Sequence, residues 1–366
     1  MSDILEVKYE GAFGYNIFFE QSFNRLFEEI KSFGVVNKRL CIITESNVGP
    51  LYAKELQMGF ANCCKEVYVF TIPAGEASKN LDFIADMYEF LIQNHFDRND
   101  MLVALGGGVI GDMTGFCAAT YLRGIDFIQI PTSLLAQVDS SVGGKKGVDF
   151  RGYINMVGAF KQPKMVYMNL STLKTLKERE FLSGMGEVIK YGFIMDRDFL
   201  GWLGEHESQI KSLDYDALEY MVKKSCDFKR KVVEIDPKET LGERAKLNLG
   251  HTLGHAIEKS LDFGLLHGEC VALGMVTSLL ISMSKGYISP EEVKEGVQLI
   301  AKFNLPVQLP DSFALDVDKV IEITKSDKKM DSGVVKFVLL KEIGEAVVEK
   351  TVTLCDMATA LETIMK

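Results

Sequence analysis

The sequence predicts an α/β domain followed by a mainly α-helical domain, and the hydrophobic pattern along the chain supports both. Short apolar, β-branched runs at 39–44, 66–72, 101–105, 127–130 and 165–170 alternate with helical patterns. Such runs are typical of parallel strands buried on both faces of a sheet. From about Glu178 the pattern changes to long segments with the 3.6-residue period of helices. One of them opens with Ser-Pro-Glu-Glu at 289–292, a capping box with proline at the first helical position.

The chain has 366 residues, which suits two domains at roughly 100–200 residues each. No linker rich in proline, glycine or serine separates the halves, so the boundary rests on the change of period. We expect an α/β domain over 1–177 and a helical domain over 178–366, with candidate functional groups in both.

Composition excludes several classes of protein. Hydrophobic residues make up 47% and charged residues 25%, as in ordinary globular chains, so disordered and fibrous classes are excluded. The net charge of −10 argues against a nucleic-acid partner or an anionic membrane surface. The seven cysteines show no CxxC spacing, and no signal peptide or membrane span of about 18 apolar residues is evident. We therefore expect a cytoplasmic protein with reduced thiols.

A glycine-rich run follows one of the predicted buried strands. Its glycines are Gly106, Gly107, Gly108 and Gly111. Glycines at the start of a helix let a pyrophosphate approach backbone N–H groups, although a tight turn alone would also use them. The usual dinucleotide motif lies on the first strand, whereas this run begins about 100 residues into the chain. We expect a nucleotide site of a different construction, with Asp112 beside the loop and Glu45 available to ribose hydroxyls.

Histidine usage is the sharpest chemical signal. The chain has five histidines, and His251, His255 and His267 fall within one short segment. This density indicates a metal site or proton transfer, although satisfied core histidines are the alternative. Taken alone, the i, i+4 spacing of His251 and His255 would make both of them ligands. Thr252 occupies the position where an HExxH metalloprotease needs glutamate, so that class does not fit.

Charged residues near glycines offer a carboxylate and a set of cations. Glu187, Lys190 and Tyr191 have i, i+3, i+4 spacing, which fits either a surface ion pair or a third metal ligand beside the histidines. Each remaining cation could be a solvated surface charge, but together they could form the local anion pocket that an acidic chain requires. These candidates are Lys145 and Lys146 with Asp139, and later Lys229, Arg244, Lys328 and Lys336.

These residues lie in motifs that closely resemble the 3-dehydroquinate synthase family. The resemblance runs from about residue 40 to 345 through GGGVIGD, YLRG, PTSLLAQVDSSVGGK, GMGEVIKYG, RAKLNLGHTLGHAIE, HGECVALGM and the DKK stretch. It implies an N-terminal NAD-binding α/β domain, a helical C-terminal metal-binding domain and a homodimer. It also implies conversion of 3-deoxy-D-arabino-heptulosonate 7-phosphate, a small sugar-acid phosphate of the shikimate pathway, to 3-dehydroquinate and phosphate.

The resemblance assigns roles position by position. It makes Glu187, His251 and His267 the ligands of zinc or cobalt, and His255 an acid/base residue, which corrects the i, i+4 pair suggested by spacing alone. The implied catalytic residues are His255, Lys145, Lys190 and Asn155. The implied substrate contacts are Arg123, Asp139, Lys145, Asn155, Lys190, Lys229, Arg244, Asn248 and Lys336, of which Arg123 is expected to reach the partner subunit's site. The implied NAD contacts are Glu45, Asn47, Glu76, Lys79, Gly106, Gly107, Gly108, Asp112, Thr132, Ser133, Lys145, Thr172 and Thr175.

Some positions depart from the family pattern. Glu45 stands where aspartate is usual, Lys146 where threonine is common, and Ile154 where a lysine usually precedes Asn155. One hypothesis is that Lys146 supplies the charge missing at position 154.

Three other classes of protein are weighed against the family. Polyol dehydrogenases resembling glycerol dehydrogenase share the glycine loop but would lack the DSSVGGK and RxxxN anchors. Sister sugar-phosphate cyclases would act on substrates without a carboxylate. A binder without catalysis does not fit the full set of ligands and His255.

Overall fold

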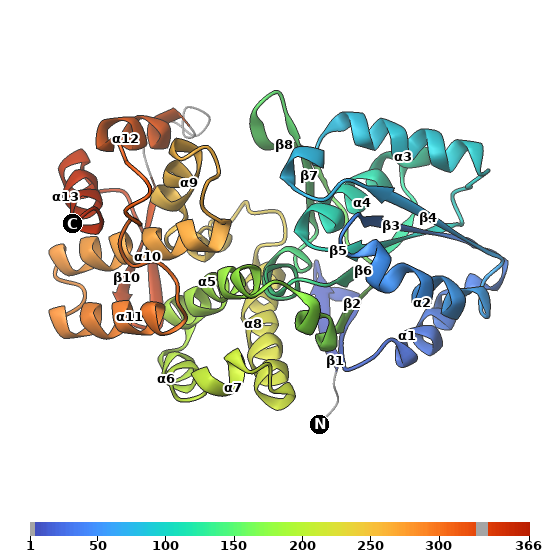
Figure 1. Ribbon diagram of the computed structural model, residues 1–366, viewed down its shortest axis with the longest axis horizontal. Coiled ribbons are helices and arrows are strands. Elements are labelled where there is room, and N and C mark those ends of the chain that lie inside the picture. The colour runs from blue at the N-terminus through green and yellow to red at the C-terminus, as the bar shows by residue number, and fades with distance from the viewer. Residues whose placement is uncertain (1–3, 327–335) are drawn as a thin grey trace. The chain divides into compact units, whose positions relative to one another are not determined.

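The computed structural model describes residues 4–326 and 336–366. The chain forms two compact units: Met1–Leu176 with Val222–Lys238, and Lys177–Met221 with Glu239–Lys366. Figure 1 labels the elements of both units.

The first unit is built on a seven-stranded sheet. In spatial order its strands are β1 (Ile4–Tyr9), β2 (Ala12–Glu20), β9 (Met165–Asn169), β6 (Asp126–Pro131), β5 (Met101–Gly106), β3 (Arg39–Glu45) and β4 (Glu66–Ile72). Only β1 and β2 pair antiparallel, and every other neighbouring pair is parallel. All five runs predicted from the sequence are strands of this sheet, so the α/β prediction is confirmed.

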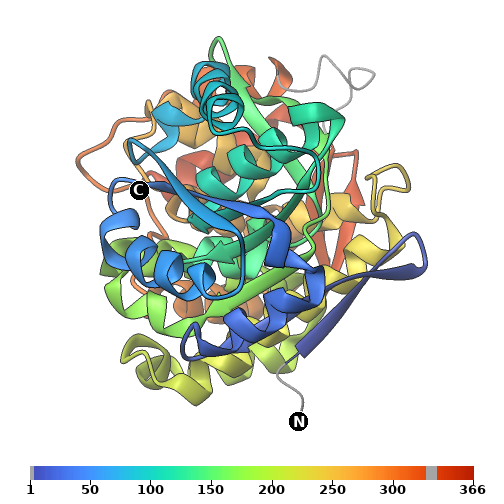
Figure 2. The same ribbon diagram turned by 90° about the vertical axis from the view of Figure 1, so that its right-hand side faces the viewer.

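Successive strand residues point to opposite faces of the sheet, so both faces carry apolar side chains. A layer of helices covers each face. On one face, Leu40 and Ile42 of β3 pack with α1 (Asn24–Glu29) and α2 (Gly49–Ala61). On the other, Cys41 and Ile43 pack with α3 (Leu81–Gln93) and α4 (Gly108–Thr120). Figures 1 and 2 show the strands between these two pairs of helices.

Short elements complete the first unit. The hairpin of β7 (Lys145–Phe150) and β8 (Tyr153–Phe160) packs against α4. A π-helical turn, η5 (Ala136–Ser140), follows β6. The remaining turns are the 3-10 helices η1 (Ile30–Phe33), η2 (Val35–Asn37), η3 (Glu76–Ser78), η4 (Tyr121–Arg123) and η6 (Leu170–Thr175).

One segment joins the first unit although its place in the sequence lies within the predicted second domain. Helix α8 (Tyr215–Ile235) begins in the second unit, and from Val222 onward it belongs to the first. The Cys226 Sγ donates to the Gln137 carbonyl, and the Lys229 ammonium donates to the Asp139 carbonyl at 2.6 Å. The division at 177/178 therefore misses residues 222–238, because these contacts bind them to η5.

The second unit is mainly helical. Its helices are α5 (Glu178–Met195), α6 (Arg197–Glu205), α7 (Glu207–Lys211), η7 (Arg244–Asn248), α9 (His251–Ser260), α10 (His267–Ser284), α11 (Pro290–Lys302), α12 (Val317–Ser326) and α13 (Leu354–Ile364). A hairpin of β10 (Phe337–Glu342) and β11 (Glu345–Glu349) is also present. The Ser289 hydroxyl accepts from the Glu292 N–H at 3.2 Å, which confirms the predicted capping box of α11.

Helix α10 is the centre of the second unit. Among the described residues it is the one helix with the length and hydropathy of a membrane span, but 78% of it is buried inside the protein. Core helices of soluble proteins share these properties.

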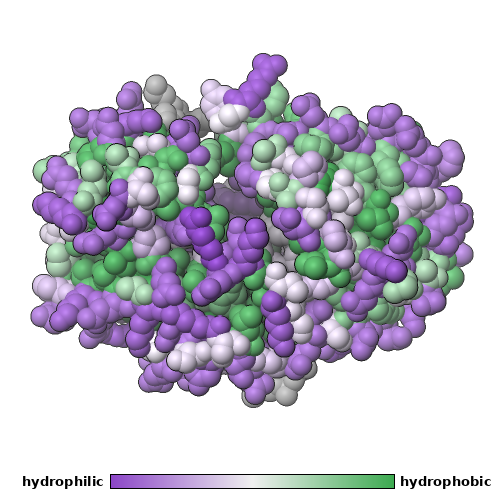
Figure 3. Space-filling view, in the orientation of Figure 1, coloured by the Kyte–Doolittle hydropathy of each residue, from purple (hydrophilic) through white to green (hydrophobic). Residues whose placement is uncertain are grey.

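Hydrophilic side chains are spread across the face seen in Figure 3.

Glycines let α10 approach its neighbours closely. A Cβ on Gly268 would lie 1.8 Å from the Ser183 carbonyl oxygen of α5, and a Cβ on Gly274 would lie 1.9 Å from the Gly250 carbonyl oxygen, just before α9. The Gly268 N–H donates to the Ser183 hydroxyl at 3.1 Å. The starts of α9 and α10 and the middle of α5 are therefore drawn together.

We expect Gly268→Ala to lower the free energy of unfolding by about 1–3 kcal/mol, because α10 must move away from α5 to admit the methyl group. Denaturant titration measures the change. The matched control is Gly201→Ala in α6, where a Cβ meets nothing within 4 Å, so stability should be unchanged or higher by about 0.5–1 kcal/mol. If Gly268→Ala is as stable as the wild type, the close contact between α10 and α5 does not contribute to stability.

Candidate active site

A buried carboxylate forms the centre of the candidate metal site in the second unit. Glu187 of α5 is 1% exposed, and its Oε2 accepts from the Lys190 ammonium one helical turn along. Its Oε1 lies 3.4 Å from His251 Nε2 and 3.6 Å from His267 Nε2, and it has no hydrogen-bond partner among the residues that the structure describes. A buried anionic oxygen without a donor is costly, so the three side chains fit a cation that would complete it.

The histidines are oriented by groups behind them. His251 Nδ1 lies 3.1 Å from the Leu249 carbonyl, and His267 Nδ1 lies 3.4 Å from Glu258 Oε2. Donation from Nδ1 to an oxygen leaves Nε2 with the lone pair that a metal needs. Both imidazoles therefore turn Nε2 toward Glu187.

His255 lies close enough to be a further ligand. Donor atoms of His251, His255 and His267 lie within 4.8 Å of one another. His255 differs from the other two histidines because it is exposed, whereas they are half-buried. The geometry thus brings together every histidine that the sequence singled out, and both the Glu187 set and the i, i+4 pair are possible ligand sets.

Electrostatics favour binding of a cation. Burial would raise the pKa of Glu187, but Lys190 and the two histidines hold this pKa well below its ordinary value. Burial, helped by Lys190, lowers the pKa of His251 to about 3, so the imidazole is neutral at pH 7. Burial opposes protonation of His267 too, but the neighbouring carboxylates of Glu187 and Glu258 raise its pKa to about 10. A metal bound at His267 must displace that proton.

Sequence reasoning missed Glu258. Its carboxylate contacts His267 from α9, and carboxylates behind a ligating histidine fix the orientation and basicity of the ring. A signal was present, since positions 251, 255 and 258 follow the i, i+4, i+7 pattern of one helix face.

The candidate nucleotide residues lie at one edge of the first unit's sheet. Gly106 ends β5, Gly107 precedes α4, and Thr132 follows β6. The other candidates follow the carboxyl ends of the remaining strands: Glu45 and Asn47 after β3, Glu76 and Lys79 after β4, and Thr172 and Thr175 after β9. Ligands of open α/β sheets bind at this edge, so the topology gathers residues that are far apart in the sequence.

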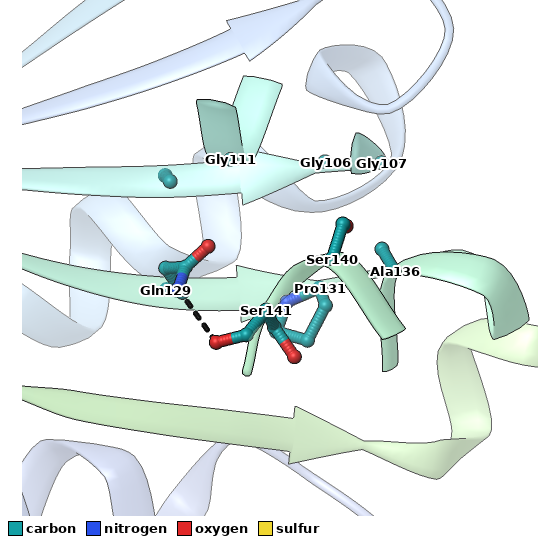
Figure 4. Close-up of a pocket in the computed structure, with 9 residues that line it drawn as sticks. Gly106, Gly107, Gly111, Gln129, Pro131, Ala136, Ser140 and Ser141 are labelled. Carbon is teal, nitrogen blue, oxygen red and sulfur yellow. Dashed lines mark hydrogen bonds between the residues drawn. The ribbon is translucent and has the colours of Figure 1, made fainter. Parts of the chain in front are cut away.

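A small pocket opens at the glycine loop (Figure 4). It is lined by Ala104, Gly106, Gly107, Gly111, Gln129, Pro131, Ala136, Ser140 and Ser141. A Cβ on Gly108 would lie 3.1 Å from the Ser140 Oγ, and one on Gly107 would lie 3.4 Å from the Ser133 Oγ. Side chains at these positions would crowd the wall, so the glycines keep the start of α4 open to a ligand.

Several predicted cofactor residues already have structural partners. Glu45 accepts from the Asn47 and Val48 N–H groups at 2.6 and 2.9 Å, which caps the turn before α2. The Thr172 hydroxyl donates to the Asn169 carbonyl at the end of β9, and the Thr175 hydroxyl donates to the Thr172 carbonyl within η6. Contact of the Glu45 carboxylate with a ribose stays a prediction, and it would share the carboxylate with this cap.

Predicted substrate residues are divided between the units. Arg123, Asp139, Lys145, Asn155 and Lys229 belong to the first unit, and Lys190, Arg244, Asn248 and Lys336 belong to the second. Lys229 pairs with Asp139 at 2.7 Å. Arg244 is buried, whereas Lys145, Asn248 and Lys336 are exposed. Lys328 and the DKK stretch lie outside the described residues.

Two of the predicted substrate residues have unusual backbone conformations. Arg123 has φ of 66° and Asn155 has φ of 53°, in the left-handed region that most residues avoid. Local strain of this kind clusters at functional sites, so both positions remain substrate-binding candidates.

Solved structures show the fold class. ValA, the 2-epi-5-epi-valiolone synthase of Streptomyces hygroscopicus, solved with NAD⁺ and Zn²⁺, matches with a TM-score of 0.87 at 23% identity, over 100% of this chain and 98% of that one. A 2-deoxy-scyllo-inosose synthase, solved with carbaglucose-6-phosphate, NAD⁺ and Co²⁺, matches with a TM-score of 0.88 at 22% identity, over 99% and 100%. A probable glycerol dehydrogenase from Sinorhizobium meliloti matches less well, at 0.66 and 14%, over 96% of both chains. The chain has the fold of these two synthases.

Sequence comparison identifies the family within this class. Residues 69–183 match the 3-dehydroquinate synthase N-terminal domain and residues 184–330 match the C-terminal domain. The 3-dehydroquinate synthase of Acetivibrio thermocellus is 46% identical over 91% of both chains, and that of Ruminiclostridium cellulolyticum is 44% identical over 90% of this chain and 91% of its own. The chain belongs to the 3-dehydroquinate synthase family, as the motif resemblance predicted.

We expect Glu187→Ala to abolish stoichiometric zinc binding, because it removes the anionic ligand from a site otherwise made of neutral imidazoles. Metal per chain is measured after zinc loading and desalting. Glu180→Ala, an exposed change on the same helix, should keep the full metal content. Wild-type metal content in Glu187→Ala would remove Glu187 from the site.

Glu258→Gln should weaken zinc affinity by about 10–100-fold while metal is still bound at saturation, as changes behind a ligating histidine do. Competition with a chelator gives the affinity. The control is Glu295→Gln, which replaces an exposed carboxylate on α11 with a carboxamide and should leave zinc affinity unchanged. Equal affinities of the two variants would contradict an orienting role for Glu258.

Proposed function

We propose that this protein is a 3-dehydroquinate synthase that converts 3-deoxy-D-arabino-heptulosonate 7-phosphate to 3-dehydroquinate and phosphate. The observation that carries the proposal is identity of 44–46% to enzymes of that name over nine-tenths of both chains. We also propose a cytoplasmic homodimer that works in the shikimate pathway, with Arg123 contacting the partner subunit's site.

The reaction has no net redox change. It combines oxidation of an alcohol, elimination of phosphate, reduction, ring opening and an aldol closure. NAD⁺ bound at the glycine-loop edge would accept a hydride and return it, so it is not consumed. The residues proposed to hold it are the strand-end set described above together with Gly108, Asp112, Ser133 and Lys145.

We assign the divalent metal, zinc or cobalt, to Glu187, His251 and His267. The fit rests on the buried Glu187 oxygen without a partner and on the two Nε2 atoms turned toward it. Such a metal supplies Lewis acidity that polarises a substrate oxygen. Lys190 holds the other Glu187 oxygen, so it orients the carboxylate besides its proposed contact with substrate.

His255 is the proposed acid/base residue. It is exposed beside two half-buried histidines, and an imidazole that reaches solvent can exchange protons during turnover. Its ring centroid lies 5.0 Å from that of His251, so it would take and return protons next to the oxygen that the metal polarises.

The substrate carries a carboxylate and a phosphate, and the chain carries a net charge of −10, so anion recognition must be local. Arg244 and Lys229 suit the carboxylate end, because guanidinium and ammonium groups make charge-assisted hydrogen bonds. The proposed phosphate contacts are Lys145, Asn155, Lys336, Asn248 and Arg123. Retention of the carboxylate anchor favours a dehydroquinate synthase over a cyclase whose substrate lacks that group.

We expect phosphate release from the heptulosonate phosphate to exceed the NAD⁺ supplied, with no net NADH absorbance, and to stop on chelation and return with zinc. Turnover of a sugar phosphate without the carboxylate, in place of the heptulosonate, would move the protein to another cyclase. Stoichiometric NADH from polyols would make it a dehydrogenase.

Lys145→Ala should lower kcat/KM for phosphate release by about 10–150-fold, the loss typical of one hydrogen bond to a charged group. Lys164→Ala, an exposed lysine change nearby, should leave the rate unchanged. Wild-type kinetics of Lys145→Ala would exclude this lysine from substrate or cofactor binding.

A further inference from the structure

Lys146 is buried in a place made for it. Its side chain is 0% exposed, whereas Lys145, the preceding residue of β7, is exposed, because successive strand residues face opposite sides. A Cβ on Gly115 of α4 would lie 2.5 Å from Lys146 Cδ and 2.6 Å from Cγ. The absence of a side chain on α4 makes room for the lysine stem.

The buried ammonium contacts the wall of the glycine-loop pocket. It donates to Gln129 Oε1 at 3.1 Å and to the Ser140 carbonyl at 3.3 Å. The Gln129 Nε2 donates in turn to the Ser141 carbonyl at 3.0 Å, which Figure 4 shows as a dashed line. Gln129, Ser140 and Ser141 all line the pocket. Lys146 and Gln129 thus hold two consecutive carbonyls at the end of η5.

The same ammonium balances charge beside the glycine loop. It lies 3.5 Å from Asp112 Oδ1, and Lys79 lies 2.9 Å from Asp112 Oδ2 and 3.6 Å from Glu76. Within ion-pair distance two lysines therefore face two carboxylates, and Asp149 adds a third acidic group near Lys79. Without Lys146 the cluster would hold an excess negative charge beside the loop, and that charge would repel a pyrophosphate.

We propose that Lys146 is a positioning residue of the NAD site, which holds the η5 wall in place and neutralises Asp112 without contacting the cofactor. Lys146 is buried against Gln129 and Ser140, whereas Lys145 is exposed, so the two lysines have different roles. The inference deepens the proposed function and depends on NAD binding by the wild-type chain.

The test is the NAD⁺ dissociation constant of Lys146→Met, which keeps the stem and removes the charge. Calorimetry on the full-length, zinc-loaded protein should show affinity about tenfold weaker than wild type, in the range for loss of a hydrogen bond to a charged group. KM for NAD⁺ should rise while kcat at saturating NAD⁺ changes less than twofold, and zinc per chain should stay at the wild-type value. Lys164→Met, an exposed lysine change, is the matched control and should bind NAD⁺ as wild type does.

A second variant tests the same inference if Lys146→Met does not fold. Lys146→Gln keeps a hydrogen-bond donor and loses the charge, so it should fold and still bind NAD⁺ more weakly. Wild-type NAD⁺ affinity in either folded variant overturns the inference, even if the melting temperature falls. Absence of NAD⁺ binding by the wild-type protein would overturn the proposed function instead, so the two failures are distinguishable.

Discussion

Burial of the Glu187 carboxylate is the constraint on which the second unit depends. A charge that is 1% exposed must be compensated by cations or donors, since its desolvation is costly. Lys190 compensates one oxygen, and the other is left between two imidazoles. That arrangement exists only because Gly268 and Gly274 allow α10 to approach α5 and the start of α9 so closely. The close packing of α5, α9 and α10 is therefore what brings the groups of the site together.

The first unit uses backbone geometry where the second uses charged side chains. Parallel strands end at a common edge, and the glycine loop exposes the start of α4 there. The pocket wall is made mostly of small residues, and hydrogen bonds from larger side chains hold it in place. Gln129 and Lys146 bond to the carbonyls of η5, and Lys229 of α8 bonds to the Asp139 carbonyl from another direction. The inclusion of residues 222–238 in this unit follows from those bonds.

An acidic protein that binds an anionic cofactor must keep its cations local. Lys79 and Lys146 are paired with Asp112 and Glu76, so they add little net charge to the loop. The proposed anion contacts include exposed groups such as Lys145 and Lys336.

The sequence by itself determined the strands, the glycine loop, the capping box at Ser289 and the family, because periodicity, turn chemistry and motif order are local properties of the chain. Only the tertiary structure decided which groups meet. The approach of α10 placed Glu187 opposite His251 and His267, and it brought Glu258 behind His267, although the spacing of positions 251, 255 and 258 already carried that signal. Adjacent lysines 145 and 146 look equivalent in the sequence, yet strand alternation and the space beside Gly115 made one exposed and one buried. Contacts of this kind join residues far apart in the chain, so they depend on packing that no local pattern records.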